Sequence, residues 1–556
     1  MIENKNKELT ALSLDIEGMT CDHCAVSIEK SFAGKEGIIN KQVSYGKKKG
    51  EFTFDSSVIS KKEIIDIINA SKSYRVAGNG SEQGSGKSHF DLIIIGGGSA
   101  AFSAAIKAEE LGLSTLMVNG GLPFGGTCVN VGCVPSKSLI RAAETAYHAS
   151  HSNFAGIKLK GVDIDFAQVI RDKKNLVAAL QQKKYMDVVT DFENLTMIEG
   201  WAEFVDTKTI LVNGKDTYTA LKLIIATGAT TNVPDIEGLN EIGYLTNVSL
   251  FDLEEKPVSI TIMGAGYIGL EIAMAYNRLG VKVRIIEFTD RVLRTQTPDI
   301  SEALEGQMKH EGIEILPNFR AVKFERKGNE TIIHCKCPDG SVTQIVEKGK
   351  VVVASGTKPN TLKLGLSNIG LQSTKSNHIA VNEKMETNIP SIYAVGDVTN
   401  TPAFVYTAAY EGKIAVENAF TGAEKKADYT SLPWVVFTDP QVAGTGLDEA
   451  QAEAKNIPFE VSKLSLSDVP RALAANDTRG FIKLIRNTET DKLIGARIVA
   501  PEGGELIQQL SMAIKYGITV KELAESFYPY LTLGEGIKLA AITFGKDVSK
   551  LSCCAS

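Results

Sequence analysis

The sequence predicts an α/β protein with two doubly wound nucleotide-binding units, preceded by a small ferredoxin-like unit. Three observations predict this fold class. A glycine-rich motif occurs twice, each time directly after a run of residues typical of a buried strand. A stretch rich in glycine and serine, residues 78–88, separates the first part of the chain from the rest. Before that stretch, strand and helix patterns follow one another in the order βαββαβ.

The composition is that of a globular protein with several domains. The chain has 556 residues, of which 43% are hydrophobic and 23% charged. Its net charge of −6 gives no basic excess for nucleic acid. The N-terminal residues lack a signal-peptide core, and the longest uncharged apolar run, 92–106, is too short to span a bilayer. We therefore expect a cytoplasmic protein that neither binds nucleic acid nor inserts into a membrane, with its cysteines used for metal binding or catalysis.

Residues 8–77 form the predicted ferredoxin-like unit. Residues 12–16 alternate as in a half-buried strand, and residues 25–32 have helical spacing. Cys21 and Cys24 form a C-x-x-C motif at the turn between these two segments. Two thiolates at one turn suit a soft ion of low coordination number, such as Hg(II) or Cu(I). A redox C-x-x-C is the alternative, and it would require a different surrounding fold.

The two glycine motifs follow the pattern of dinucleotide-binding turns. In such a turn the first glycine permits the tight bend, the second lets the backbone approach a pyrophosphate, and the third position lets helix pack on strand. The helix N-terminus then faces the phosphates. The first motif lies after residues 90–95 and the second after residues 258–263; their members are Gly96, Gly98 and Ala101, and Gly264, Gly266 and Gly269.

A polar residue follows each motif at the same spacing, 23 residues after the first glycine. Glu287 stands where a carboxylate would bind a ribose 2′-hydroxyl, which favours NADH and repels the extra phosphate of NADPH. Arg291 and Arg294 lie nearby and would partly offset this repulsion. Asn119 takes the corresponding place in the first unit and is a weaker acceptor than a carboxylate.

A cysteine pair follows the first nucleotide-binding unit. Cys128 and Cys133 lie five residues apart at the start of a helical stretch. At that spacing they can form a disulfide, and the helix N-terminus would lower the pKa of a thiol there. The alternative is a pair of buried structural cysteines.

The segment around this pair, residues 125–137, resembles the redox centre of the pyridine nucleotide–disulfide oxidoreductases. The resemblance runs from about residue 89 to the C-terminus and includes the motifs at 226–228, 356–360 and 394–397. It implies the following division: an FAD-binding domain over 89–235 and 354–427, an NAD(P)-binding domain over 236–353, and an α+β dimerisation domain over 428–556.

The same resemblance implies roles for individual residues. Cys133 becomes the thiolate against the flavin, Cys128 the interchange thiol, and Lys137 a catalytic cation that pairs with Glu271 and lies near the flavin. Asp397 is expected to bind the ribityl chain. Further flavin contacts through the backbone are expected at Ala100, Gly120, Thr127, Ala202 and Val405.

The C-terminal part departs from relatives that act on disulfides. Those relatives use a histidine–glutamate pair as general acid–base, because each thiol must gain or lose a proton near neutral pH. Here Glu535 is kept, but Tyr530 stands at the histidine's place. Tyrosine, with an ordinary pKa near 10, is a poor proton shuttle but can be a hydroxyl ligand. Two adjacent cysteines, Cys553 and Cys554, lie close to the end of the chain.

Together the C-x-x-C unit, the redox pair, the tyrosine and the terminal cysteines resemble the mercuric reductases. This resemblance implies NAD(P)H-dependent reduction of Hg(II), delivered as a complex with small thiols, and a homodimer whose tail serves the partner's active site. NADPH is the expected donor, NADH is the alternative that Glu287 favours, and a membrane mercury carrier could donate metal to the N-terminal unit. Tyr185 matches the family's second active-site tyrosine. The expected metal ligands are Cys21, Cys24, Cys128, Cys133, Cys553 and Cys554.

Two alternatives stay open at this point. One is a thioredoxin- or dithiol-type reductase with a fused copper module, and the other is a metal chaperone that has kept a reductase scaffold. Two further features are interpreted as structural: the cysteines of the Cys335-Lys336-Cys337 segment, which share one face of a predicted strand, and the apolar run that begins at Trp434.

Overall fold

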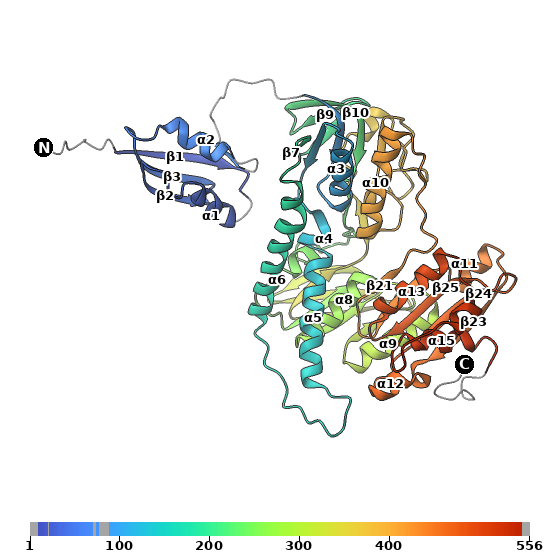
Figure 1. The fold of residues 1–556 in the computed structure, drawn as a ribbon. Coiled ribbons are helices and arrows are strands. Elements are labelled where there is room, and N and C mark those ends of the chain that lie inside the picture. The colour runs from blue at the N-terminus through green and yellow to red at the C-terminus, as the bar shows by residue number, and fades with distance from the viewer. Residues whose placement is uncertain (1–8, 20–21, 71–73, 77–87, 547–556) are drawn as a thin grey trace. The chain divides into compact units, whose positions relative to one another are not determined.

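The computed structural model describes residues 9–19, 22–70, 74–76 and 88–546 (Figure 1). It divides into two compact units, 1–88 and 89–556, each described by itself below. Cys21, Cys553 and Cys554 lie outside the described residues, as does nearly all of the Gly/Ser-rich stretch. In the part of the chain that is described, no helix is long and apolar enough to cross a membrane.

The first unit is a four-stranded antiparallel sheet with two helices, which confirms the predicted ferredoxin-like order. The strands are arranged β2-β3-β1-β4, so that the first and third strands occupy the centre. Helix α2 begins with a capping box in which Ser60 and Glu63 exchange hydrogen bonds. The elements are β1 (Leu9–Glu17), α1 (Asp22–Ser31), β2 (Ile38–Ser44), β3 (Lys49–Asp55), α2 (Lys61–Asn69) and β4 (Arg75–Val76).

The second unit begins with a seven-stranded sheet that carries the first glycine motif. Its strands β6, β5 and β10 are parallel, and the residues at their carboxyl ends are buried, as expected for a sheet covered on both faces. Its strands are β5 (His89–Ile95), β6 (Thr115–Asn119), β7 (Leu195–Glu199), β8 (Ala202–Phe204), β9 (Thr209–Val212), β10 (Asp216–Ile225) and β20 (Ile392–Ala394).

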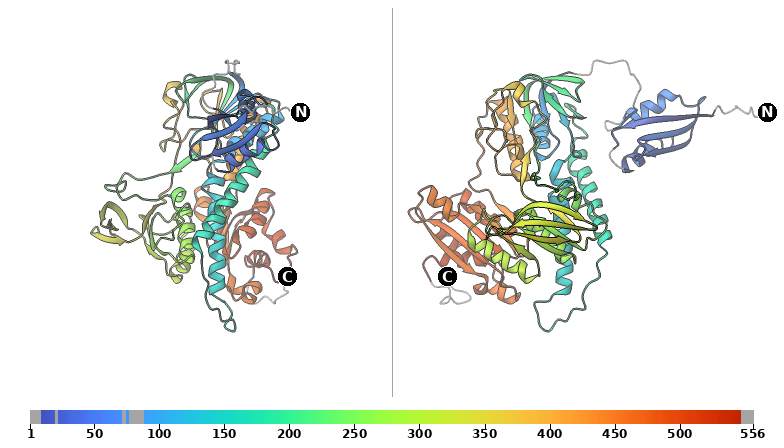
Figure 2. Two further views of the ribbon diagram at one scale, coloured as in Figure 1. Left: turned by 90° about the vertical axis from the view of Figure 1, so that its left-hand side faces the viewer. Right: turned by 180° about the vertical axis from the view of Figure 1, so that it is seen from behind.

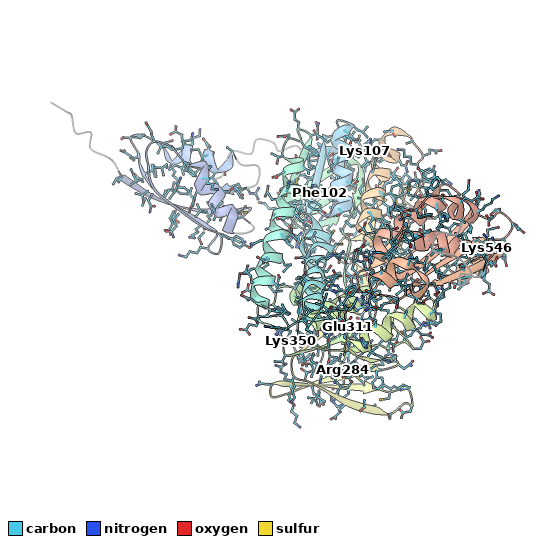
Figure 3. All side chains as sticks on the ribbon, turned by 60° about the horizontal axis from the view of Figure 1, so that its bottom comes forward. Phe102, Lys107, Arg284, Glu311, Lys350 and Lys546 are labelled. Atoms are coloured by element: carbon cyan, nitrogen blue, oxygen red, sulfur yellow. The ribbon has the colours of Figure 1, made fainter. Side chains whose placement is uncertain are left out.

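Two helices distant in sequence, α3 (Ser99–Glu110) and α10 (Val405–Thr421), lie side by side on this sheet (Figure 1). They approach so closely that a Cβ at Gly412 would overlap the carbonyl oxygen of Ala100. Figure 3 shows Phe102 and Lys107 on α3. This packing brings the N-termini of both helices to the same region of the molecule.

A second, four-stranded parallel sheet carries the second glycine motif, in the order β14-β13-β12-β18. A small antiparallel sheet, β15-β16-β17, adjoins it. The elements of this region are β12 (Ser259–Met263), α8 (Tyr267–Arg278), β13 (Lys282–Ile286), α9 (Pro298–His310), β14 (Glu314–Leu316), β15 (Arg320–Lys327), β16 (Glu330–Lys336), β17 (Val342–Glu347) and β18 (Lys350–Val353).

The C-terminal region is a five-stranded antiparallel sheet in the order β21-β22-β25-β24-β23, with helices packed on it. The doubly wound and α+β parts therefore confirm the predicted fold class. The elements of the C-terminal region include β21 (Trp434–Val436), β22 (Gln441–Gly446), β23 (Phe459–Ser465), β24 (Phe481–Asn487), β25 (Leu493–Ala500), α13 (Gly503–Lys515), α14 (Val520–Glu525) and α15 (Glu535–Ile542).

Two long helices, α5 (Cys133–Ser150) and α6 (Phe166–Gln181), run beside one another along the second unit (Figure 2). Helix α5 packs against α8 of the second sheet. Because α5 begins at one predicted redox cysteine and α8 begins at the second glycine motif, this packing connects the two predicted reaction partners.

The motifs at 226–228 and 356–360 pair with each other. The segment after Thr227 pairs with the segment before Asn360 as the short strands β11 (Ala229–Thr231) and β19 (Thr357–Pro359). Asn360 Nδ2 donates to Thr227 O at 2.9 Å, and Thr227 Oγ1 donates to Asn360 O at 2.9 Å. These bonds join the two places where the chain leaves and re-enters the first sheet region.

Candidate active site

Cys128 and Cys133 lie together, as the sequence predicted. Cys128 belongs to a short helix, α4 (Gly126–Asn130), and is half-buried, whereas Cys133 is exposed and is the first residue of α5. Neither is part of a disulfide, and a hydrogen bond joins them, with the Cys128 thiol as donor and the Cys133 sulfur as acceptor. The pair is therefore close enough to share one proton or one metal ion.

The electrostatics of the pair are asymmetric. The hydrogen bond from Cys128 and the charge of Lys137 lower the pKa of Cys133 to about 7, although desolvation of the sulfur by neighbouring protein atoms and the charge of Glu271 oppose this. The position of Cys133 at a helix N-terminus acts in the same direction. The same hydrogen bond, with burial, raises the pKa of Cys128 far above its ordinary value. Cys133 is thus the thiolate and Cys128 the proton donor.

Lys137 and Glu271 form the ion pair that the resemblance to the oxidoreductases implied. Lys137 Nζ lies 2.7 Å from Glu271 Oε2, and the Glu271 side chain is only 9% exposed. The other oxygen of Glu271 accepts a hydrogen bond from the backbone N–H of Phe437, and the Phe437 ring lies 4.3 Å from the ammonium. The cation is therefore held in one place, beside the thiolate.

Tyr185 lies near the cysteine pair, as predicted. It belongs to a π-helical turn (Gln182–Met186) that continues α6, a kind of turn that often occurs at functional sites. Its hydroxyl lies 3.1 Å from Ser99 Oγ, and its ring packs edge-on against Phe102. Burial, and the nearby charges of the two cysteines, raise the pKa of Tyr185. The phenol is therefore neutral near pH 7.

Tyr185 also lines a groove of about 540 Å³ between α3, the π-helical turn and α10. Sequence reasoning missed a second tyrosine in its wall, Tyr406, which donates a hydrogen bond to Pro433 O and lies within electrostatic range of Cys133. A signal was available, because Tyr406 directly follows the predicted flavin contact Val405. Other lining residues are Ser99, Phe102, Ile106 and Lys184.

The first glycine motif fits the pyrophosphate of a dinucleotide. A Cβ at Gly96 would overlap the carbonyl oxygen of Ala226, and one at Gly126 would lie 2.6 Å from Gly98 Cα. Backbone therefore meets backbone here, and Gly98 caps α3 without a side chain that could occupy its free N–H groups. The predicted backbone contacts lie at the ends of several elements: Ala100 and Ala101 in α3, Gly120 directly after β6, Thr127 in α4, Ala202 at the start of β8 and Val405 at the start of α10.

Asp397 fits the predicted hydroxyl-binding role. It follows the turn at Gly396, is half-buried, and forms no ion pair with any described residue. Burial is the main reason that its pKa is raised. The buried carboxyl of Glu411 accepts hydrogen bonds from Tyr429 Oη and from the backbone N–H of Gly396, the residue before Asp397, both at 2.7 Å. A carboxylate in such a place is ready to accept hydrogen bonds from a polyol.

The second glycine motif has the same construction. A Cβ at Gly264 would lie 2.5 Å from Ala354 O, and one at Gly269 would overlap Gly264 O. At Gly266, in contrast, a Cβ would meet no described atom within 4 Å. The first and third glycines thus serve close packing, whereas the second faces open space at the N-terminus of α8, where a pyrophosphate would bind.

Glu287 stabilises the second glycine loop through hydrogen bonds. Its side chain is buried; Oε2 accepts a hydrogen bond from Ala265 N at 2.7 Å, and Oε1 accepts two from Thr289. Asn119 also touches its loop, since a Cβ at Gly97 would lie 2.6 Å from its side-chain oxygen. Binding of a ribose by Glu287 stays a prediction, and it requires lone pairs beyond those that already accept hydrogen bonds.

The two arginines expected to attract a 2′-phosphate both pair with one carboxylate of the same loop. Asp290 forms ion pairs with Arg291 and with Arg294, each at 2.9 Å. Arg291 nevertheless keeps a buried Nε that has no hydrogen-bond partner among the described residues.

Near the C-terminus, Tyr530 is 55% exposed, in the segment before α15. Glu535 is the first residue of α15, and its Oε2 is buried without a hydrogen-bond partner among the described residues. The carboxylate of the usual proton-transfer pair is therefore present, but it has no imidazole to orient.

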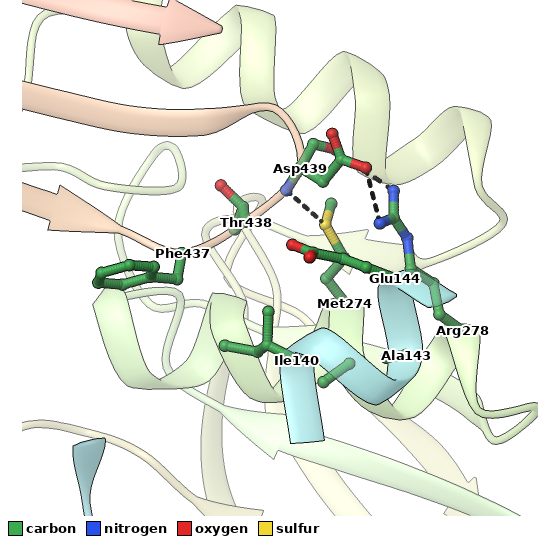
Figure 4. Close-up of a pocket in the computed structure, with 9 residues that line it drawn as sticks. Ile140, Ala143, Glu144, Met274, Arg278, Phe437, Thr438 and Asp439 are labelled. Atoms are coloured by element: carbon green, nitrogen blue, oxygen red, sulfur yellow. Dashed lines mark hydrogen bonds and ion pairs between the residues drawn. The ribbon is translucent and has the colours of Figure 1, made fainter. Parts of the chain in front are cut away.

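A buried ion cluster joins the second sheet to the C-terminal region (Figure 4). Arg278 of α8 lies between Glu311 and Asp439, with ion-pair distances of 2.6 and 2.8 Å. Met274 lies against the same segment and accepts a hydrogen bond from Asp439 N. The small cavity beside it holds about 10 Å³ and is too small for a ligand.

The remaining cysteines have different surroundings. Cys24 lies in α1, half-buried against the core of the first unit. Cys335 is fully buried in β16, and burial raises its pKa to about 11. Cys337 lies one residue beyond the end of that strand. Among the described residues, no group of three or more potential ligands is arranged to hold a metal. The arrangement around Cys335 agrees with its structural interpretation.

Comparison with known proteins accounts for almost the whole chain. Residues 90–412 match the pyridine nucleotide-disulphide oxidoreductase family, residues 432–541 the dimerisation domain of that family, and residues 13–74 the heavy-metal-associated domain. Mercuric reductase from Staphylococcus aureus is 40% identical over 98% of both chains. Mercuric reductase from Lysinibacillus sphaericus is also 40% identical, over 98% of this chain and 100% of its own.

Similar solved structures have the same fold. The HOCl-induced flavoprotein disulfide reductase RclA from Escherichia coli is 27% identical with a TM-score of 0.71, covering 80% of this chain and 98% of its own. Its Cu(II) complex is 26% identical with a TM-score of 0.74, covering 82% and 100%. The chain therefore belongs to the pyridine nucleotide-disulphide oxidoreductases and, within them, to the mercuric reductase family with an N-terminal heavy-metal-associated domain.

Proposed function

We propose that this chain reduces Hg(II) to Hg(0) with NAD(P)H as the electron donor, and that Cys128 and Cys133 hold the metal during reduction. The observation that carries the proposal is the thiol–thiolate pair at the start of α5, held beside the Lys137 cation. Two sulfurs at one point are the ligand set that a soft ion prefers. Tyr530 supports the same conclusion, because it removes the proton shuttle that disulfide reduction needs.

FAD, when bound in the first unit, connects the two-electron chemistry of the nicotinamide to the cysteine pair. The chain contributes positioning. Glu271 fixes the Lys137 ammonium, and Asp397 offers a carboxylate to the ribityl hydroxyls. The two electrons of one nicotinamide first convert a Cys128–Cys133 disulfide into the thiol pair, and the two electrons of a second nicotinamide reduce the metal.

Metal transfer proceeds by replacing one sulfur at a time. The Cys133 thiolate attacks an incoming Hg(II) dithiolate complex and displaces one thiolate, which takes the proton of Cys128. Cys128, now ionised, displaces the second thiolate, so that the metal ends with two protein sulfurs. Tyr185, whose phenol is neutral near pH 7, can donate a hydrogen bond to a leaving sulfur. Two electrons then yield Hg(0), which leaves because it binds thiolates poorly.

The other parts of the chain fit a supply route. Cys21 and Cys24 would capture the metal in the first unit, and Cys553 and Cys554 would pass it to the redox pair. The match of residues 432–541 to a dimerisation domain supports a homodimer, in which Tyr530 and the terminal cysteines serve the partner's site. We assign FAD to 89–235 and 354–427, the nicotinamide nucleotide to 236–353, subunit pairing to 428–556, and the protein to the cytoplasm.

One assay tests the proposal. Purified protein is mixed with Hg(II), an excess of a small thiol, and either NADPH or NADH, while nicotinamide oxidation and Hg(0) vapour are measured. We expect metal-dependent oxidation with one Hg(0) for each nicotinamide oxidised, faster with NADPH. If no vapour forms with either donor, the proposal is wrong.

A dithiol-type reductase is the second candidate, favoured by the likeness to a protein named as a flavoprotein disulfide reductase. It predicts oxidation of NADPH by small disulfides in the absence of metal. A metal chaperone predicts tight binding of Hg(II) without any nicotinamide oxidation. The same assay, run with a disulfide and without metal, therefore distinguishes all three functions.

A further inference from the structure

The adenosine half of FAD needs a binding surface that the sequence motifs do not supply. In a doubly wound unit, the pyrophosphate binds at the first helix, and the adenosine ribose binds at the end of the second strand. That strand is β6, and it ends at Asn119, whose side-chain amide already donates to Leu122 O at 2.8 Å. The neutral amide of Asn119 is a weaker ribose acceptor than a carboxylate, so a side-chain contact nearby would strengthen the binding of this half of the cofactor.

Trp201 lies at this strand end. The backbone N–H of Gly200 donates to Asn119 O at 2.9 Å, and Trp201 itself exchanges two hydrogen bonds with Asn213, both at 2.9 Å. The backbone that carries the indole is therefore fixed from both sides. Trp201 also directly precedes Ala202 in the chain, a predicted cofactor contact.

The indole rests on glycine. A Cβ at Gly120 would lie 2.9 Å from the Trp201 ring, and one at Gly121 would lie 3.4 Å from it. Any side chain at position 120 would displace the ring. Although one side of the indole is packed on these glycines, the Trp201 side chain is 55% exposed. Exposure of so large an apolar side chain to water is unfavourable. The arrangement presents an aromatic surface next to the ribose position.

Lys363 completes the surface. Its ammonium lies 4.8 Å from the centre of the Trp201 ring, and it forms no ion pair with any described residue. Lys363 is placed by the segment after β19, where Leu364 O accepts a hydrogen bond from Phe204 N at 2.9 Å. The cation steadies the ring and adds positive charge near a cofactor that carries two phosphates.

We propose that Trp201, with Lys363, is a binding platform for the adenosine half of FAD. Bases stack on aromatic side chains whatever their sequence context, and one such contact changes affinity by roughly tenfold. The inference rests on the assignment of FAD to the first unit. It adds to that assignment a side-chain contact outside the glycine motif.

The test measures FAD binding to the full-length chain, independently of mercury. We expect Trp201→Ala to weaken FAD affinity about tenfold. Trp201→Phe should keep affinity within about threefold of the unchanged protein, because it retains an aromatic surface. Trp434→Phe is the matched control and should not change FAD affinity. Unfolding temperatures of the FAD-free variants exclude loss of folding as the cause.

A second readout uses the fact that the chain has only two tryptophans. In Trp434→Phe, all indole emission comes from Trp201, and bound FAD should protect it several-fold from quenching by acrylamide. Equal quenching with and without FAD, or Trp201→Ala affinity within twofold of the unchanged protein, would overturn the platform. If the unchanged protein binds no FAD at all, the assignment of the cofactor fails instead.

Discussion

Replacement of Lys137 by methionine tests the electrostatics of the redox pair. The pKa of Cys133, about 7, makes about half of this thiol ionised at pH 7, against roughly 3% for an ordinary cysteine. Lys137→Met removes a cation that lowers this pKa and leaves the buried Glu271 charge, which raises it. We expect the pKa to rise by about one unit, so that the ionised fraction at pH 7 falls about fivefold.

The assay is alkylation of the reduced protein by iodoacetamide between pH 5 and 10, with the modified cysteine identified by mass spectrometry. The midpoint for Cys133 should lie near pH 7 in the unchanged protein and near pH 8 in Lys137→Met. Lys137→Arg should keep the lower midpoint, and the double variant with Glu271→Gln should recover part of the shift. A midpoint that stays near 7 in Lys137→Met would refute the assigned role of the cation.

Three further changes, the first of them with a matched control, have outcomes that the structure predicts. Arg278→Met leaves the buried Glu311 carboxylate without a cation, whereas Asp439 keeps its ion pair with Arg479, and it should lower the free energy of unfolding by about 3–5 kcal/mol in urea titrations. Arg284→Met, which breaks a more exposed ion pair, should cost less than about 1 kcal/mol. Gly269→Val should abolish NADPH binding in calorimetry while FAD is retained, because a side chain there would drive α8 away from its strand. Tyr530→His should give at least about tenfold faster reduction of small disulfides, since Glu535 is available to orient an imidazole. An unchanged disulfide rate would show that the tyrosine is not what prevents this reaction.

The parts of the site that the sequence predicted are those set by local structure. A side chain at Gly96 would overlap the carbonyl oxygen of Ala226. Glycine is therefore required at this position of the motif, and the sequence shows it there. Cys133 at the first position of α5 follows from the helical pattern after it. The pairing of Lys137 with Glu271 spans 134 residues and was predicted only through resemblance to a family.

The parts that the sequence did not predict depend on contacts between distant segments. Tyr406 comes near Cys133 only because α10 packs against α3. The π-helical turn that carries Tyr185 has no sequence signature of its own. Glu287 was interpreted as a ribose ligand, but its hydrogen bonds to the loop depend on a backbone path that no residue type specifies.

The most direct test of the central claim is a single-turnover experiment on the Cys128–Cys133 pair. Protein reduced by one equivalent of NADPH is mixed with one equivalent of Hg(II) dithiolate and one further equivalent of NADPH, and the Hg(0) released is measured. We predict one Hg(0) per protein site, and none from Cys128→Ser or Cys133→Ser. Hg(0) from either serine variant at the rate of the unchanged protein would contradict the assignment of this pair as the site of metal reduction.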